Sequence, residues 1–212
     1  RYTMDFVSID FETATSSPNS ICSMGICSVK DDRVIDTTEI LIRPDPFEFK
    51  DYNILIHGIT PDMVRDKPKF CDIWEKIHPV IENTVVVAHN AVFDVGALRA
   101  TLDHFELEYP TFDYICTVKL SQKAYPDLPS HKLNALADSL GLSFNHHHAG
   151  DDAYMCAEVL LRIMRDFELD SLEDIEKKFD IGVGKLFPGC YVPCTKSKKS
   201  KSHREVYTAQ KS

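Results

Sequence analysis

The 212-residue sequence lacks a long uninterrupted hydrophobic run, and no apolar stretch approaches the roughly 18 residues that a membrane-spanning helix needs. Its first residues also lack a basic segment followed by an apolar one, which is the pattern of a secretory signal. These two absences argue against a membrane protein and against a secreted one. We therefore expect the protein in the cytoplasm and without a membrane partner.

A disulfide framework is also absent. The seven cysteines are an odd number, and they are scattered, several of them within apolar periodic segments. Small secreted domains stapled by disulfides usually show an even number at regular spacing. Cys190 and Cys194 lack a second pair at the spacing of a zinc site. We therefore expect reduced thiols, as in a cytosolic protein.

Positive charge is scarce, because 24 Lys and Arg residues stand against 33 Asp and Glu residues, a net charge of −9. Phosphate binding usually depends on Lys and Arg, so this balance at first argues against a nucleic-acid partner. The shortage is uneven, since six basic residues and one acidic residue follow residue 195. Such a Lys/Ser-rich end is typically solvated. A linker to a further domain and an electrostatic tether for DNA are alternatives that the sequence leaves open.

The hydrophobic pattern predicts a mixed α/β fold. Three strands come first, and a two-residue connection suited to a hairpin joins the second and third; they span 4–12, 21–30 and 33–42. A proline-containing loop follows, after which Thr60 and Pro61 fit the start of a helix. Short buried strands then alternate with helices; we expect strands at 85–88 and 112–116 and helices at 70–81, 93–106, 116–125, 132–140, 151–168 and 171–179. We expect one domain over 1–180 and an irregular segment with a basic tail over 181–212.

Two carboxylates, Asp10 and Glu12, stand near the end of the first predicted strand. Side chains two residues apart in a strand point to the same face. Two like charges on a buried face are costly unless a cation shares the space. The pair therefore indicates a cation site.

Further acids follow other predicted elements. Asp94 comes after the buried strand 85–88, at a strand end where open α/β sheets place their sites, and Asp152 begins a later helix. Clusters made only of carboxylates favour Mg²⁺ or Mn²⁺ over zinc, and a pair of such ions can clamp both oxygens of a phosphoryl displacement. The expected reaction is therefore phosphodiester hydrolysis. Each acid alone also fits a solvated turn or a helix N-terminus, so the prediction depends on their combination.

Three segments in chain order resemble the motifs of the DnaQ-like DEDDh 3′–5′ exonucleases, whose type member is the proofreading epsilon subunit of bacterial DNA polymerase III. They are Asp10-Phe11-Glu12-Thr13, then His89-Asn90-Ala91-Val92-Phe93-Asp94, then His147 followed five residues later by Asp152. The resemblance covers about residues 4–167, and His57-Gly58-Ile59-Thr60 is similar to a family segment beside the terminal nucleotide. It implies a ribonuclease H-like fold whose five-stranded mixed sheet, three antiparallel strands and then two parallel ones, is flanked by helices.

The resemblance also implies the site. Two divalent cations, Mg²⁺ or Mn²⁺, would be bound by Asp10, Glu12, Asp94 and Asp152, and His147 would be the general base, a role that suits a side chain with a pKa near neutrality. His146 with Asp151 has the same spacing, so counting alone does not exclude that register, but Ala153 after Asp152 matches the family's Asp-Ala pair. Substrate contacts are implied for Phe11, Thr13, His57, Asn90 and Phe93.

The activity implied by the resemblance is hydrolysis of single-stranded or frayed DNA from its 3′ end, releasing nucleoside 5′-monophosphates, in proofreading or repair and with or without a DNA polymerase subunit as partner. The acidic body is compatible with this activity, because a few terminal nucleotides need few phosphate contacts and bound cations supply charge. RNA ends or short oligoribonucleotides are the alternative substrate. A non-catalytic nucleic-acid-binding or polymerase-docking module is the alternative of another class, although no motif carboxylate or histidine is missing. The oligomeric state is not predicted.

Overall fold

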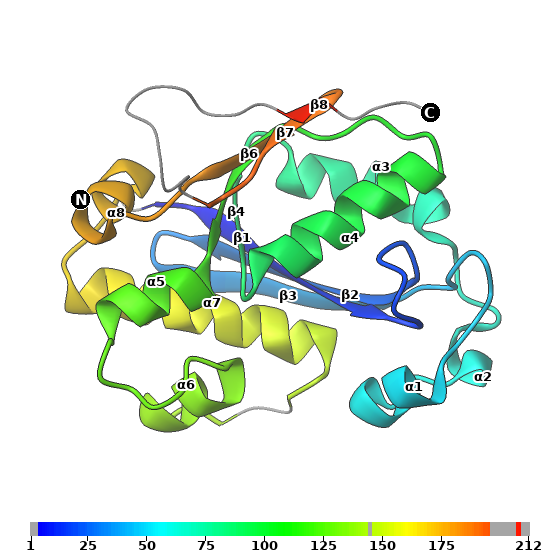
Figure 1. Cartoon of the computed structure of the whole chain (residues 1–212), viewed down its shortest axis with the longest axis horizontal. Helices are drawn as coiled ribbons and strands as arrows, with labels where there is room; N and C mark the ends of the chain where they lie inside the picture. The colour runs from blue at the N-terminus through cyan, green and yellow to red at the C-terminus, as the bar shows by residue number, and fades with distance from the viewer. Residues whose placement is uncertain (1–3, 144–145, 196–206, 209–212) are drawn as a thin grey trace.

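A computed structural model describes residues 4–143, 146–195 and 207–208. Its centre is a mixed sheet in the order β3-β2-β1-β4-β5-β6-β7-β8 (Figure 1). The strands are β1 Phe6–Thr13, β2 Ile21–Lys30, β3 Arg33–Leu41, β4 Val85–Ala88, β5 Phe112–Cys116, β6 Gly184–Phe187, β7 Cys190–Val192 and β8 Tyr207–Thr208. The first three strands pair antiparallel, whereas β4 lies parallel to both β1 and β5. The carboxyl ends of β1 and β4 therefore meet at one edge of the sheet.

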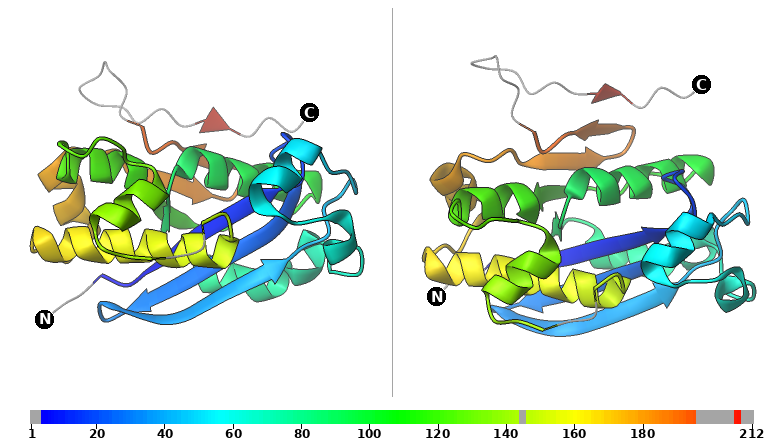
Figure 2. Two further views of the ribbon diagram at one scale, coloured as in Figure 1. Left: turned by 90° about the horizontal axis from the view of Figure 1, so that it is seen from below. Right: turned by 60° about the horizontal axis from the view of Figure 1, so that its bottom comes forward.

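Helices cover both faces of this sheet (Figures 1 and 2). They are α1 Asp51–His57, α2 Pro61–Val64, α3 Phe70–Ile81, α4 Ala91–His104, α5 Thr117–Ala124, α6 Leu133–Ser139, α7 Ala149–Asp166 and α8 Leu172–Phe179. One buried cluster joins α5, α6, α7 and α8 to the sheet, and a second joins α3 and α4 to the sheet. None of the helices in the described ranges combines the length and apolarity that crossing a membrane requires.

The alternation of β1 decides which side chains reach the site. Val7, Ile9 and Phe11 enter the buried cluster under α3 and α4. Ser8 points to the other face, where its hydroxyl donates a hydrogen bond to the carbonyl of Ala153 in α7. Because successive strand residues alternate in direction, Asp10 shares the face of Ser8 and lies under the start of α7.

The predicted strands and helices are present, and the arrangement of three antiparallel strands followed by parallel ones is confirmed. Three expectations are wrong. The sheet is not five-stranded, because β6, β7 and β8 extend it beyond β5, and part of the segment 181–212 is therefore regular. Strands this short give almost no alternation signal. Helix α1 lies where the sequence suggested only a loop.

Strand β6 packs tightly on β5 through Gly184. A Cβ atom at Gly184 would lie 2.3 Å from the ring of Tyr114. We expect Gly184→Ala to lower the free energy of unfolding in urea by about 1–3 kcal/mol, because the ring or the strand must move. Gly96→Ala is the matched control, since nothing lies within 4 Å of the added Cβ. In the helix α4 it should stabilise by about 0.5–1 kcal/mol. Equal stability of the Gly184 variant and the unmodified protein would contradict the packing.

Candidate active site

The first carboxylate pair lies on the half-buried end of β1. An oxygen of Asp10, one of Glu12 and one of Asp152 all lie within 4.8 Å of one another. Asp152 comes from the first turn of α7 and is only 4% exposed. The structure therefore brings together two predicted ligands from β1 and one that is about 140 residues away along the chain.

Asp94 lies beside this group in the first turn of α4, which follows β4. It is 1% exposed, and its Oδ1 accepts a hydrogen bond of 2.9 Å from the backbone N–H of Phe11. Phe11 stands between Asp10 and Glu12, so this hydrogen bond ties α4 to the strand segment that carries the pair. Burial is the largest cause of the raised pKa of Asp10, and the negative charge of Asp94 raises it further.

The segment before α7 holds Asp152 from two sides. The Nδ1 of His146 lies 2.9 Å from Asp152 Oδ1, and the backbone N–H of His147 donates to Asp152 Oδ2 at 3.2 Å. His147 adopts a left-handed φ of 69°, and its ring centroid lies 3.8 Å from that of His146. The structure thus places Asp152 rather than Asp151 beside Asp10 and Glu12. The side-chain hydrogen bond with Asp152 is made by His146. The sequence favoured His147 as the general base, and that role stays a prediction.

Burial is the largest cause of the raised pKa values of these acids. It holds the pKa of Asp10 and of Asp94 well above the usual range and also raises the pKa of Asp152. Burial, together with the charges of Asp152 and Glu39, raises the pKa of Glu12 to about 8. Asp10 Oδ2 is buried without a hydrogen-bond partner in the described part of the chain. Crowded carboxylates with an orphaned oxygen fit a divalent cation, which would satisfy that oxygen and offset the repulsion.

The pKa of His147 is lowered, in contrast to the raised pKa values of the acids. Partial burial and the neighbouring His146 lower it, although Asp152 opposes the change. A lowered pKa keeps the imidazole neutral at pH 7, and a neutral imidazole can accept a proton.

The predicted substrate-contacting residues divide into two groups. Phe93 is 43% exposed beside Asp94, and Asn90 is an exposed residue that precedes α4 with a left-handed φ of 72°. Both side chains are open to solvent near the start of α4, and their contact with substrate stays a prediction. The Phe11 side chain is 2% exposed and lies in the core, on the face of β1 opposite to Asp10, so its burial argues against a side-chain contact and the predicted substrate contact stays a prediction.

His57 and Thr13 contact each other rather than open solvent. The carbonyl of Thr13 accepts from His57 Nε2 at 3.0 Å and from Asn53 Nδ2 at 3.0 Å. The N–H of Ile59 donates to His57 Nδ1 at 3.0 Å, so the backbone engages both ring nitrogens. Both residues are only 7% exposed, and direct contacts of His57 and Thr13 with substrate stay predictions.

Sequence reasoning missed Glu39. This residue lies on β3, and its negative charge raises the pKa of both Asp10 and Glu12. It belongs to none of the three motifs, and its surroundings, RVIDTTEIL, read as an ordinary exposed strand. Only the strand register, which places Glu39 and Asp10 on either side of Gly25, shows that Glu39 lies near the site.

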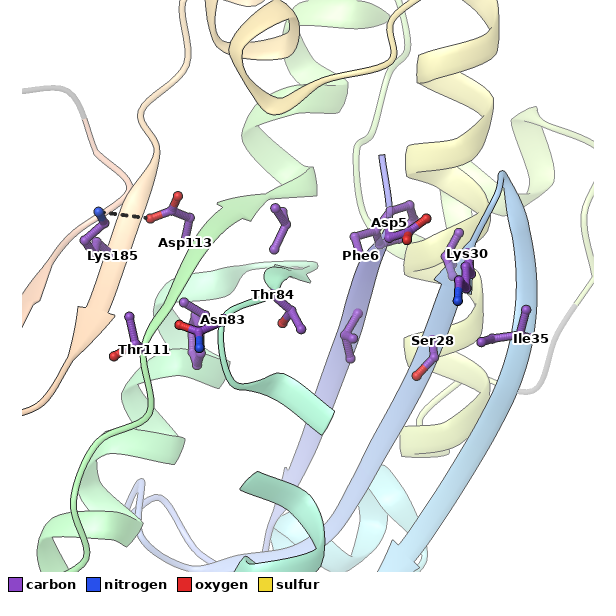
Figure 3. A pocket seen from close by; sticks show the side chains of 14 residues that line it. Asp5, Phe6, Ser28, Lys30, Ile35, Asn83, Thr84, Thr111, Asp113 and Lys185 are labelled. Atoms are coloured by element: carbon purple, nitrogen blue, oxygen red, sulfur yellow. Dashed lines mark ion pairs between the residues drawn. The ribbon is translucent and has the colours of Figure 1, made fainter. Parts of the chain in front are cut away.

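A pocket of about 640 Å³ lies at the opposite end of the same strands. It is lined by the beginnings of β1, β4 and β5 and includes Phe6, Asn83 and the ion pair of Lys185 with Asp113 (Figure 3). No candidate catalytic, metal-binding or substrate-binding residue is among the described side chains that line it. The pocket is therefore separate from the carboxylate site. Substitutions of its lining residues can serve as controls for substitutions in that site.

Known proteins resemble most of the chain. A family model described as "Exonuclease" (RNase_T) matches residues 7–160. "DNA polymerase III PolC-type" of Clostridium perfringens is 32% identical in an alignment of 196 positions, and the match covers 86% of this chain and 13% of that protein. "3'-5' exonuclease DinG" of Staphylococcus saprophyticus is 28% identical in an alignment of 173 positions, and the match covers 79% of this chain and 19% of that protein. The chain thus spans less than a fifth of the length of either relative.

Two solved structures share the arrangement of elements. Exonuclease X in complex with 5′ overhanging duplex DNA matches with a TM-score of 0.66 and 28% identity, over 81% of this chain and 98% of that one. The nuclease domain of 3′hExo, a DEDDh family member bound to rAMP, matches with a TM-score of 0.67 and 21% identity. This match covers 78% of this chain and 94% of that one. The α/β ribonuclease H-like fold expected from the resemblance is thereby confirmed.

The raised pKa values predict that a cation stabilises the protein more at high pH. Glu12 has an ordinary pKa of 4.5 and a folded pKa of about 8, so the stability that its proton contributes is present below pH 4.5 and is lost as the pH rises through 8. A cation bound to the ionised carboxylates offsets this loss. We expect Mn²⁺ to raise Tm more at pH 8 than at pH 6, by several degrees, since about 1 kcal/mol shifts Tm by roughly 2–4 °C in a chain of this size.

Thermal unfolding with and without Mn²⁺ at the two pH values measures this difference. In the double variant Asp10→Asn, Glu12→Gln, the Mn²⁺-dependent shift of Tm should be lost at both pH values. A shift of the unmodified protein that is the same at pH 6 and pH 8 would contradict the prediction.

Proposed function

Because this chain belongs to the DnaQ-like DEDDh 3′–5′ exonuclease family, a family of phosphodiester hydrolases, we propose that it removes nucleotides stepwise from the 3′ end of DNA, single-stranded or frayed. Hydrolysis adds water across the bond between phosphorus and the 3′ oxygen, releasing a nucleoside 5′-monophosphate and leaving a new 3′ hydroxyl. The main support is the group of oxygens of Asp10, Glu12 and Asp152 within 4.8 Å of one another, drawn from two elements far apart in the sequence.

The four acidic residues would hold the cations. Asp10, Glu12, Asp94 and Asp152 are proposed to bind two divalent cations, Mg²⁺ or Mn²⁺, which supply positive charge at the scissile phosphate and acidify a bound water. Two of these carboxylates are oriented before any cation arrives, since Phe11 N–H binds Asp94 and His147 N–H binds Asp152. Such orientation reduces the entropy that cation binding costs.

His147 is the proposed general base. Its lowered pKa keeps the ring neutral near pH 7, so a ring nitrogen can take the proton of the attacking water. A ring nitrogen of His147 lies within 4.8 Å of an Asp152 oxygen, as does one of His146. His146 is the competing candidate, because its Nδ1 already contacts Asp152 Oδ1.

DNA is the proposed substrate, and the similarity to Exonuclease X, solved with duplex DNA, supports this choice. The half-exposed ring of Phe93 beside Asp94 offers a surface on which a terminal base can stack. One relative is named as a DNA polymerase III and another as a 3′–5′ exonuclease, and the chain matches less than a fifth of each. These names support a further proposal, a role in proofreading or repair beside a polymerase. The cytoplasmic location stays a prediction from the sequence.

Asp152→Asn should abolish nuclease activity. Loss of one ligand carboxylate removes several kcal/mol of transition-state stabilisation, so we expect the rate to fall roughly a thousandfold or more. Degradation of 5′-labelled single-stranded DNA in Mg²⁺ measures this rate, and EDTA should abolish it in the unmodified protein.

Asp151→Asn is the matched control, since Asp151 is the half-buried neighbour outside the carboxylate group, and Lys185→Ala in the opposite pocket is a second control. Both should retain full activity. Full activity of the Asp152 variant would refute the assignment, and faster cleavage of RNA of the same sequence would refute the choice of DNA.

His147→Ala should lower kcat about 10²–10⁴-fold, which is the usual contribution of a positioned general base. Mn²⁺ binding, measured by calorimetry, should be largely retained. His146→Ala should have a smaller effect on kcat. A larger loss of kcat in His146→Ala than in His147→Ala would assign the general base to His146.

A further inference from the structure

Glu39, Gly25 and Asp10 form one row across three strands. Gly25 of β2 pairs with Asp10 of β1 on one side and with Glu39 of β3 on the other. Residues directly opposite each other in neighbouring strands point to the same face. Two carboxylates therefore flank a position that has no side chain, on the face that α7 covers.

The start of α7 fills this gap. A Cβ atom at Gly25 would lie 1.8 Å from the carbonyl oxygen of Ala149 and 2.7 Å from the nitrogen of Gly150. A Cβ atom at Gly150 would in turn lie 3.0 Å from the Cβ of Glu39. The first turn of α7 thus rests directly on the backbone of β2, which only glycine at residue 25 permits.

Glu39 binds the helix end in this position. Its Oε1 accepts a hydrogen bond of 3.0 Å from the N–H of Gly150. The first N–H groups of a helix have no partner within the helix, and a carboxylate there is also favoured by the helix dipole. The residue before α7, His148, makes no capping hydrogen bond with its side chain. A residue of β3 therefore does what a local capping side chain usually does.

We propose that Glu39 is a positioning residue of the active site, which holds the first turn of α7 so that Asp152 meets Asp10 and Glu12. Asp152 lies two residues beyond Gly150, and its carboxylate is also bound by His146 and His147. A displacement of this turn would therefore move a cation ligand and both candidate bases together. The inference depends on the proposed function, since the site that Glu39 positions is the proposed cation site.

Three variants test this role. Glu39→Ala removes the acceptor, Glu39→Gln keeps an acceptor oxygen without the charge, and Asp36→Ala is the matched control. Asp36 is an exposed acid of the same strand that lies opposite Ser28, and its carboxylate accepts from Thr38 Oγ1. Each variant is measured for Mn²⁺ affinity by calorimetry, for kcat and KM on single-stranded DNA, and for amide hydrogen exchange at Gly150 in the cation-free protein.

In Glu39→Ala we expect Mn²⁺ affinity and kcat to fall about tenfold or more, the usual effect of losing a partner that orients a ligand. KM should change little, and the Gly150 amide should exchange faster. Glu39→Gln should restore all of these values, and Asp36→Ala should resemble the unmodified protein.

Unchanged Mn²⁺ affinity and unchanged exchange at Gly150 in Glu39→Ala would overturn the proposal. A Gln variant as impaired as the Ala variant would also overturn it, because the charge of Glu39 and not its hydrogen bond would then matter. If the unmodified protein binds no Mn²⁺, the proposed function fails. The exchange rate of Gly150 would still decide whether Glu39 holds the helix.

Discussion

The structure is organised around the mutual repulsion of four carboxylates that share one largely buried space. Asp10, Glu12, Asp94 and Asp152 come from β1, α4 and α7, and burial raises the pKa of each. In a flexible chain such groups would move apart. Here β1 is held between β2 and β4 and packs into hydrophobic clusters on both faces of the sheet. The hydrophobic effect on either side therefore maintains an electrostatic arrangement that is unfavourable by itself.

The two helices at the site reduce this repulsion. Asp94 lies in the first turn of α4 and Asp152 in the first turn of α7, so the positive ends of two helix dipoles face the carboxylates. Backbone N–H groups of Phe11 and His147 add a hydrogen bond to each of these two acids. Asp10, by contrast, keeps one oxygen without a partner among the described residues. Neutralisation is thus partial, and it is least complete on the strand, which is where the proposed cations would supply the missing positive charge.

The sequence predicted those features that depend on local pattern. The alternation of β1 and the three acidic motifs placed Asp10, Glu12, Asp94 and Asp152 on the correct elements, because the first motif lies within a strand and the other two lie where a helix begins. Features that depend on contacts between distant segments were not predictable. The hydrogen bond of Glu39 to Gly150 spans 111 positions, and the hairpin of β6 and β7 is too short for a periodic signal. Burial of Phe11 was predictable from strand alternation alone, but the motif suggested a substrate contact.

The position of β3 in the sheet has a further consequence, for association between molecules. In the part of the chain that is described, β3 is a terminal strand of the sheet, and most of its residues are exposed. A terminal strand offers unpaired backbone groups to any other strand, and charged side chains discourage such pairing. Arg33, Asp36 and Glu39 are exposed along β3 and would have to lie against a second molecule's strand. The acidic side chain that binds the start of α7 is therefore also one of the charges on this terminal strand that would disfavour edge-to-edge pairing of two copies.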